Sequence, residues 1–360
     1  MKIIHTGDLH IGSAFHNLPA EKARLRRTEI LAAFSRLCAY AKDSGVTAVL
    51  LAGDLFDENK TARHIKKQVF AAIAAANPVC FFYVSGNHDD EFDGGDELPK
   101  NLYLFGQRHG WESYALGENV VVTGMDSKTM TAQSLSGLRL SPEHFNIVVL
   151  HGDINGELNG KDSISLPLLQ NKFIDYLALG HIHKPMLDCQ RLDVRGKYRY
   201  CGCFEGRGFD EMGERGFFLL DIQNKTVVGE KFLSLSARKV VQVDVDISAC
   251  KTYYEMENAV FATLRSVEQK DVCKIVLRGR VVPGLKKDFT LLSSRLEGRC
   301  FYIKIEDESR IIFSANDYLS DVTERGEFVR EVGRYSMNDN QREEILEVGL
   351  KALAGEEIDL

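Results

Sequence analysis

Apolar, β-branched runs alternate with amphipathic stretches over the first half of the chain. Hydrophobic residues between positions 25 and 41 recur at helical spacing, and residues 62–76 repeat that pattern. Alternation of this kind predicts an α/β fold in which helices pack on a largely buried sheet. Six apolar runs predict strands: Lys2–Thr6, Val46–Ala52, Val79–Ser85, Val120–Thr123, Ile147–Leu150 and Tyr176–Leu179.

The pattern changes twice further along the chain. A glycine-rich segment at 202–216 precedes two predicted strands, Phe217–Ile222 and Thr226–Leu233, which would complete the first domain. The next residues follow the order strand, helix, strand, helix, strand, which predicts a small α+β module. The remainder is acidic and mainly helical. We therefore predict three parts, at 1–235, 236–308 and 309–360.

Side chains able to bind metals directly follow five of the six predicted strands. The carboxyl ends of parallel strands meet at one edge of a sheet, so these side chains should converge. Each motif alone is weak, because surface turns and hydrogen-bonded buried histidines are common. Their shared position and order indicate a site. They are Asp8 with His10, Asp54, Asn87-His88-Asp89, His151, and His181 with His183.

This set of donors indicates the chemistry. Asp, Asn and His without thiolate suit Mn²⁺, which we favour, and also Fe²⁺, Zn²⁺ or Mg²⁺. Two cations about 3.5–4 Å apart could polarise a phosphate and hold a hydroxide for in-line attack on phosphorus. The leaving oxygen then needs a proton, and a histidine is its natural donor. His88 is the candidate general acid, and Asp89 could orient it by accepting a hydrogen bond.

In this order the five motifs resemble the calcineurin-like metallophosphoesterases. Residues 4–12, 53–57 and 177–185 are similar to the DNA-repair exonuclease branch, which includes SbcD-like and YhaO-type proteins. The resemblance implies a β-sandwich flanked by helices, a small α+β cap domain that contacts DNA, and a helical C-terminal tail. It also implies an SMC-like ATPase partner and pairing of two copies of the chain.

The resemblance further implies a ligand set. One metal would take Asp8, His10, Asp54 and His183, and His88 would be the catalytic histidine. The other metal would take Asp54, Asn87, His151 and His181.

One stretch departs from the branch pattern. Where these nucleases usually have Pro-Gly-Ser or Pro-Gly-Thr, this chain has Cys201-Gly202-Cys203, whereas 206–211 and 214–216 resemble the YhaO type. The departure leaves the metal chemistry intact and favours YhaO-type proteins over SbcD proper. It leaves exonuclease and endonuclease activity both open.

Charge is unevenly distributed along the chain. The net charge of −7 argues against a uniformly basic nucleic-acid binder. Between positions 274 and 304, however, eight basic residues stand against two acidic ones, and such clustering favours phosphate contact. A solvated basic face remains the alternative for the basic residues near position 25. The candidate nucleic-acid contacts are Arg24, Arg26, Arg27, Lys286 and Lys287.

Together these patterns predict a cytoplasmic two-metal phosphodiesterase acting on DNA in repair. No apolar run reaches the roughly 18 residues of a membrane span, and the chain enters its first strand without a signal peptide. The second hypothesis is a small-nucleotide phosphodiesterase or a phosphomonoesterase of the same superfamily. Residues 53–58 lack the arginine of the protein phosphatases, which counts against that branch. The third hypothesis is a non-catalytic scaffold that binds DNA or an ATPase.

Overall fold

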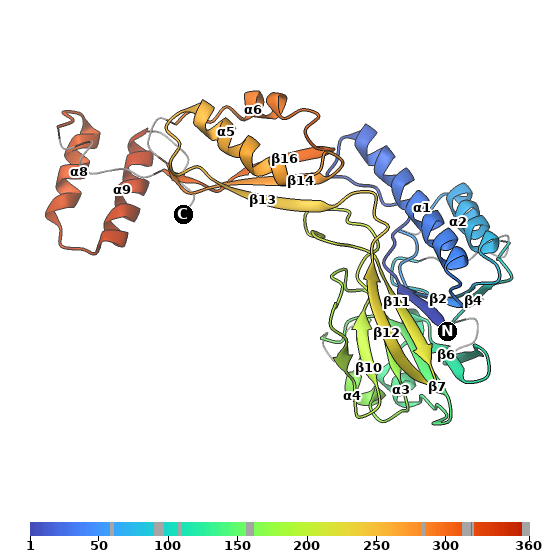
Figure 1. Ribbon diagram of the computed structural model, residues 1–360. Helices are drawn as coiled ribbons and strands as arrows, with labels where there is room; N and C mark the ends of the chain where they lie inside the picture. Colours follow the sequence, from blue (N-terminus) through green and yellow to red (C-terminus); the bar gives the residue numbers. More distant parts are fainter. Residues whose placement is uncertain are drawn as a thin grey trace. The chain divides into compact units, whose positions relative to one another are not determined.

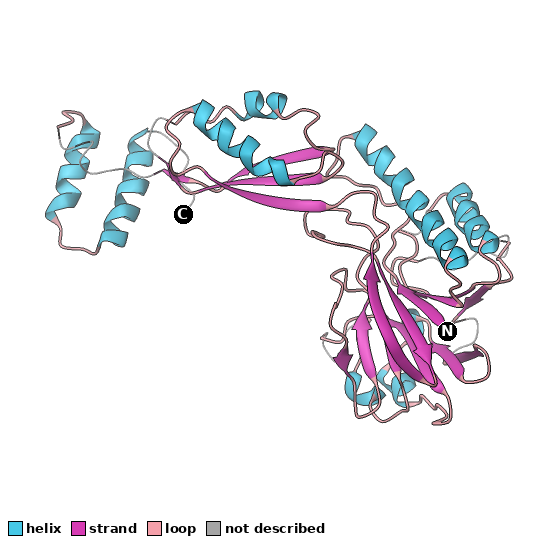
Figure 2. Ribbon diagram, viewed as in Figure 1, coloured by secondary structure: helices cyan, strands magenta, loops and turns pink. Residues whose placement is uncertain are grey.

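The computed structural model describes residues 1–57, 61–89, 97–106, 110–155, 162–281, 285–311, 318 and 320–354. The chain forms two compact units, Met1–Val240 and Val241–Leu360. Figure 1 follows the chain through both units, and Figure 2 separates their helices from their strands. None of the described helices is both long enough and apolar enough to cross a membrane.

The first unit contains two six-stranded sheets. In the first sheet β1 to β4 run parallel, whereas β11 is antiparallel to β1 and β12 is antiparallel to β11. The strands in spatial order are β12 (Thr226–Leu233), β11 (Phe217–Gln223), β1 (Lys2–Thr6), β2 (Ala48–Ala52), β3 (Cys80–Val84) and β4 (Leu102–Leu104).

In the second sheet the central strands are parallel and the two edge strands are antiparallel to their neighbours. The strands in spatial order are β5 (Glu112–Ala115), β6 (Val120–Gly124), β7 (Phe145–His151), β8 (Tyr176–Gly180), β10 (Lys197–Tyr200) and β9 (Gln190–Arg191). All eight strands predicted for this unit are confirmed, but β4, β5, β9 and β10 were not predicted.

The two sheets and their helices form four layers (Figure 2). Apolar side chains such as Leu50 and Ile147 fill the space between the sheets. Helices α1 (Ala20–Asp43) and α2 (Arg63–Ala75) share a second core with the other face of the first sheet. The 3₁₀ turn η1 (Ser127–Thr129) precedes the short helices α3 (Ala132–Ser136) and α4 (Leu166–Leu169), and these helices pack on the second sheet. The predicted α/β sandwich flanked by helices is confirmed.

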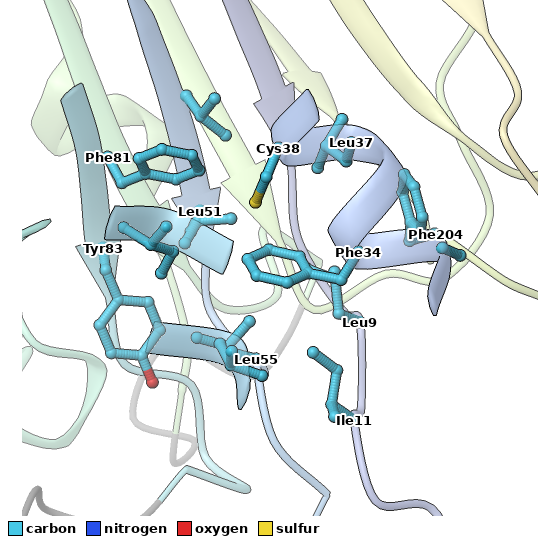
Figure 3. Close-up of a cluster of buried hydrophobic side chains, with 14 of the residues drawn as sticks. Leu9, Ile11, Phe34, Leu37, Cys38, Leu51, Leu55, Phe81, Tyr83 and Phe204 are labelled. Carbon is cyan, nitrogen blue, oxygen red and sulfur yellow. The ribbon is translucent and has the colours of Figure 1, made fainter. Parts of the chain in front are cut away.

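The loops after β1 and β2 are anchored in the core under α1. Leu9, Ile11 and Leu55 are buried in the same cluster as Phe34 of α1, as Figure 3 shows. Burying a Leu or Ile side chain stabilises a fold by about 1.5–3 kcal/mol. The polar residues next to these anchors are therefore held by hydrophobic packing.

The second unit begins with the predicted β–α–β–α–β order, which is confirmed. Its sheet order is β13-β14-β16, and its core is built on residues such as Ile275 and Leu292. Helix α5 begins with a capping box between Thr252 and Glu255. The elements are β13 (Val240–Asp246), α5 (Tyr253–Thr263), η2 (Leu264–Ser266), β14 (Val272–Arg278), β15 (Arg280–Val281), α6 (Phe289–Arg295), β16 (Tyr302–Asp307) and β17 (Arg310–Ile311).

Two further helices complete the described residues of the second unit. Helices α8 (Glu324–Arg334) and α9 (Asp339–Ala354) share a small core of Val329, Val332 and Leu346. The helical character predicted for this end of the chain is confirmed for 324–334 and 339–354, and parts of 309–360 lie outside the described residues. The predicted domain boundaries near 235 and 308 stay predictions.

Candidate metal centre

The loops that follow β1 and β2 are joined through their backbones. The amide of Asp8 donates to the carbonyl of Gly53, and the amide of His10 donates to the carbonyl of Asp54, both at 3.0 Å. Asp8, His10 and Asp54 all have φ between 46° and 48°, and His181 has φ of 99°. Residues with side chains rarely adopt this left-handed region, so the surrounding structure must impose it. Such local strain is typical of functional sites.

His10 and His183 face one another through their Nε2 atoms, which lie 3.2 Å apart. The Nδ1 atom of His10 is 3.0 Å from the carboxylate of Asp57, and the Nδ1 atom of His183 is 2.6 Å from that of Glu211. Because an ionised carboxylate only accepts hydrogen bonds, both Nδ1 atoms carry protons, and a neutral ring then has its lone pair on Nε2. Two facing lone pairs need a positive charge between them. Nitrogen ligands bound at about 2.0–2.1 Å to one cation lie at about this separation.

A second pair of acceptors has the same arrangement. The Nδ1 atom of His151 donates to the carbonyl of Ala52 at 2.9 Å, which leaves its Nε2 as an acceptor. That Nε2 lies 3.0 Å from Oδ1 of Asn87. Oδ2 of Asp54 stands 3.5 Å from Nε2 of His151 and 3.7 Å from Nε2 of His10. Asp54 is thus a common neighbour of both pairs, and these side chains would suit two divalent cations.

Asp8 and His181 lie at the edges of these two pairs. The carboxylate of Asp8 accepts from the amide of His181 at 3.0 and 3.1 Å, and it forms close groups with His10 and His183 and with Asp54 and His151. The half-buried ring of His181 lies edge-on to that of His151, with centroids 5.1 Å apart. Among the described residues, no cluster of His, Cys, Asp and Glu ligand atoms includes His181.

Burial shapes the protonation of this centre. Burial, together with the nearby charge of Asp54, raises the pKa of Asp8 well above its ordinary value. Burial lowers the pKa of His10 and of His181, which favours the neutral imidazoles that metals bind. Burial acts to raise the pKa of Asp57, but hydrogen bonds from His10 and Ser13 hold it at about 2. A centre with crowded carboxylates and neutral imidazoles is suited to cations.

Close approach at two glycines is part of this geometry. A Cβ on Gly53 would stand 2.1 Å from Nδ1 of His151, and a Cβ on Gly86 would stand 2.0 Å from Oδ1 of Asp54. Real Cβ atoms essentially never approach other atoms so closely. Only glycine therefore lets these loops reach the centre.

Sequence reasoning assigned no role to Asp57, Glu211 or Arg207. The structure places Asp57 behind His10 and Glu211 behind His183, and the guanidinium of Arg207 contacts both carboxylates. A signal existed for each residue, since Asp57 closes the segment after Asp54 and the other two belong to the distinctive stretch 206–211. Their function depends on contacts between distant parts of the chain, which spacing alone does not reveal.

His88 and Asp89 occupy different environments. His88 is exposed, its ring centroid lies 5.3 Å from that of His10, and its amide donates to Asp54 at 3.0 Å. The carboxylate of Asp89 is buried and accepts from the amides of Leu55, Phe56 and Gly86. Within the described part of the chain, no hydrogen bond joins Asp89 to the His88 ring. The contacts of Asp89 therefore tie the loop after β3 to the loop after β2.

The candidate nucleic-acid contacts differ in accessibility. Arg24 and Lys286 are exposed, whereas Arg27 is partly buried and donates to the carbonyl of Ala14. Arg26 is 1% exposed and donates to Glu29, Glu205 and the carbonyl of Gly206. This corrects the prediction for Arg26, because α1 turns that side chain into the protein and its charge is already paired there.

The basic cluster between positions 274 and 304 is largely paired within the protein. Lys274 and Lys304 both contact Glu306, at 2.6 and 2.7 Å, because β14 and β16 lie side by side. Arg278 pairs with Asp244 and Glu308. Lys287, one of the candidate contacts, pairs with Asp307 at 2.6 Å. The positive surplus in the sequence is therefore much smaller on the folded surface.

Residues 1–185 match the family model of the calcineurin-like phosphoesterases, so the chain belongs to that family. The family hydrolyses phosphoester bonds and uses a centre of two metals. The resemblance stated from the motifs is thus confirmed.

Three relatives show which branch the chain is similar to. The chain is 27% identical over 304 residues to the uncharacterized metallophosphoesterase YhaO of Bacillus subtilis, and the aligned stretch covers 78% of this chain and 72% of the relative. It is 26% identical over 365 residues to the DNA double-strand break repair protein Mre11 of Haloferax volcanii, covering 98% and 75%. It is 21% identical over 288 residues to a component of the nuclease SbcCD of Staphylococcus epidermidis, covering 68% and 72%. These homologues support membership of a family of DNA-repair nucleases.

Proposed function

We propose that this protein is a phosphodiesterase that uses two divalent cations, preferably Mn²⁺, to hydrolyse DNA. The observation that carries the proposal is the pair of acceptor–acceptor contacts, His10 with His183 and His151 with Asn87, on either side of Asp54. Neutral hydrogen-bonding groups do not stabilise such contacts, whereas cations do.

Each residue then has a defined task. One cation would be held by Asp8, His10, Asp54 and His183. The other would be held by Asp54, Asn87, His151 and His181. When bound, the two cations polarise the phosphate and supply a nucleophile at neutral pH.

His88 would donate a proton to the leaving oxygen. Its exposed ring stands beside His10 at the open side of the centre, where a substrate can reach it. Asp89 supports His88 indirectly, because its carboxylate fixes the backbone of the loop that carries the histidine. We therefore assign proton transfer to His88 and its placement to Asp89.

DNA is the proposed substrate because two of the three relatives carry DNA repair or nuclease names. The exposed side chains of Arg24 and Lys286 could contact phosphates. The same resemblance supports an SMC-like ATPase partner and pairing of two copies of this chain. A cytoplasmic location would agree with that role.

One observation favours the second hypothesis, a small-nucleotide phosphodiesterase or a phosphomonoesterase. The ion pairs of Lys274, Arg278 and Lys287 leave fewer cations for a polymer than the sequence indicated. A non-catalytic scaffold has less support, since it would not need the strained backbone of Asp8, His10 and Asp54.

The test compares substrates under one set of conditions. Purified protein is incubated with Mn²⁺ and end-labelled single- or double-stranded DNA, and in parallel with para-nitrophenyl phosphate and its bis-ester. We expect DNA shortening, and His88→Ala should reduce it by about 10²- to 10⁴-fold, the usual contribution of a general acid. The control is His144→Ala, because His144 lies just before β7, at the end away from His151.

The outcomes separate the hypotheses. Hydrolysis of the small esters alone would favour the second hypothesis. DNA binding without hydrolysis of any substrate would favour the scaffold. Unchanged cleavage by His88→Ala would remove His88 as the acid.

A further inference from the structure

The guanidinium of Arg207 holds together the two carboxylates that orient His10 and His183. Its Nη1 lies 3.3 Å from Oδ1 of Asp57, and its Nη2 lies 2.9 Å from Oε1 of Glu211. The amide of Arg207 also donates to Oε2 of Glu211 at 2.7 Å. One side chain therefore links the groups behind both histidines.

The position of Arg207 is imposed by its surroundings. Arg26 donates to the neighbouring Glu205 and to the carbonyl of Gly206, and the amide of Ala237 donates to Glu205 at 2.7 Å. On the other side, Arg215 donates to the carbonyls of Glu211 and His183. The segment 205–211 is thus fixed at both ends by contacts within the protein.

We propose that Arg207 is a positioning residue for one of the two cations, the one held between His10 and His183; this inference rests on the proposed two-cation function. Asp57 and Glu211 carry like charges on the same side of the centre. The positively charged guanidinium of Arg207 contacts both carboxylates. Its planar fork sets the direction of each carboxylate. Each carboxylate in turn sets the direction of an imidazole.

The second cation should be insensitive to Arg207. The His151 ring is oriented by the carbonyl of Ala52 and Asn87 faces its Nε2, so no described hydrogen bond links either residue to Arg207. Loss of Arg207 should therefore separate the two ions in affinity. A general defect in folding would weaken both ions together.

The test is calorimetric titration of the metal-free full-length protein with Mn²⁺. Wild type should bind two ions. Arg207→Ala should bind one ion with wild-type affinity and the other about 10- to 100-fold more weakly, the usual effect of losing an outer partner of a metal ligand. Arg207→Lys keeps the charge but lacks the planar fork, so its affinity for the weakened ion should lie between those of the wild type and Arg207→Ala. The matched control is Arg195→Ala, which removes the ion pair of Arg195 with Asp175; Asp175 lies just before β8, at the end of that strand away from His181.

The outcomes distinguish this inference from its premise. Wild type binding fewer than two ions would overturn the two-cation function itself. If the wild type binds two ions, two results would overturn the role of Arg207. In the first, Arg207→Ala binds both ions with wild-type affinity; in the second, it binds both ions more weakly by the same factor. Should Arg207→Ala fail to fold, Arg207→Lys decides, since wild-type affinity for both ions in that variant would refute positioning by the fork.

Discussion

Replacing Gly86 with alanine should disrupt both cation sites at once. The added Cβ would lie 2.0 Å from Oδ1 and 2.5 Å from the backbone nitrogen of Asp54; the nitrogen belongs to the backbone, and Oδ1 is held in place by the amide of His88 at 3.0 Å. Restoring ordinary contact requires a movement of about 1 Å between the two loops. Metal sites tolerate deviations of only about 0.2 Å in ligand distances. Because Asp54 is the common neighbour of both acceptor pairs, its displacement affects both ions.

Two measurements on Gly86→Ala test this reasoning. Titration with Mn²⁺ should show both ions weakened, in contrast to the single ion that Arg207→Ala should lose. Thermal unfolding in chelator should show a loss of about 1–3 kcal/mol, as expected for overpacking. The control is Gly229→Ala, since a Cβ on Gly229 would meet only a side-chain atom of Asp221 at 3.7 Å. Two ions bound by Gly86→Ala with wild-type affinity would refute the claim that this contact sets the position of Asp54.

Three further predictions concern pH, stability and DNA. In the metal-free protein, the raised pKa of Asp8 favours the fold most below its ordinary value of 3.8, and this contribution is lost as the pH rises through the raised value. In chelator, the melting temperature of the wild type relative to that of Asp8→Asn should therefore fall as the pH rises above about 4. The comparison cancels the opposite contribution of His10 and His181, whose lowered pKa values favour the fold as the pH rises; a difference between the two melting temperatures that does not change with pH would contradict the assignment. Phe34→Ala should cost about 3–5 kcal/mol in denaturant unfolding, because the side chain of Phe34 in α1 is fully buried against the first sheet; a loss below 1 kcal/mol would show that the core refills the cavity. In titrations of DNA at several salt concentrations, Lys286→Ala should lower the slope of log affinity against log salt by about 0.9, whereas Lys287→Ala should change it less because of its ion pair; the reverse order would exclude Lys286 as a phosphate contact.

The strands and the gathering of the polar residues could be predicted from local pattern. Buried parallel strands such as β2 and β8 consist of apolar residues throughout, so their ends are visible in the sequence. Residues that directly follow such strands are brought to one edge by the topology of the sheet. The approach of Asp8, His10 and Asp54 to one another follows from that rule.

Other features depended on contacts that spacing does not encode. Strand β10 contains Lys197 and Arg199 among its four residues, so it lacks the apolar signature of its neighbours. The burial of Arg26 reflects Glu205, far along the chain. Likewise, the count of basic residues near position 280 ignored the carboxylates that sheet pairing brings to them, such as Glu306. Charge in a sequence is therefore a weaker guide to a surface than hydrophobic pattern is to a core.

The place of β1 in its sheet has a consequence for biosynthesis. Ile3 pairs with Ala48 on one side and with Leu220 on the other, so the first strand is enclosed only after residues 217–223 have been made. His183 and its partner Glu211 also come late in the chain. During translation, a nascent chain that has just reached Asp54 still lacks the other candidate ligands, which are Asn87, His151, His181 and His183. The uptake of cations that we propose must therefore follow synthesis of nearly the whole first unit, since contacts this distant in sequence form only after the long loop between them has closed.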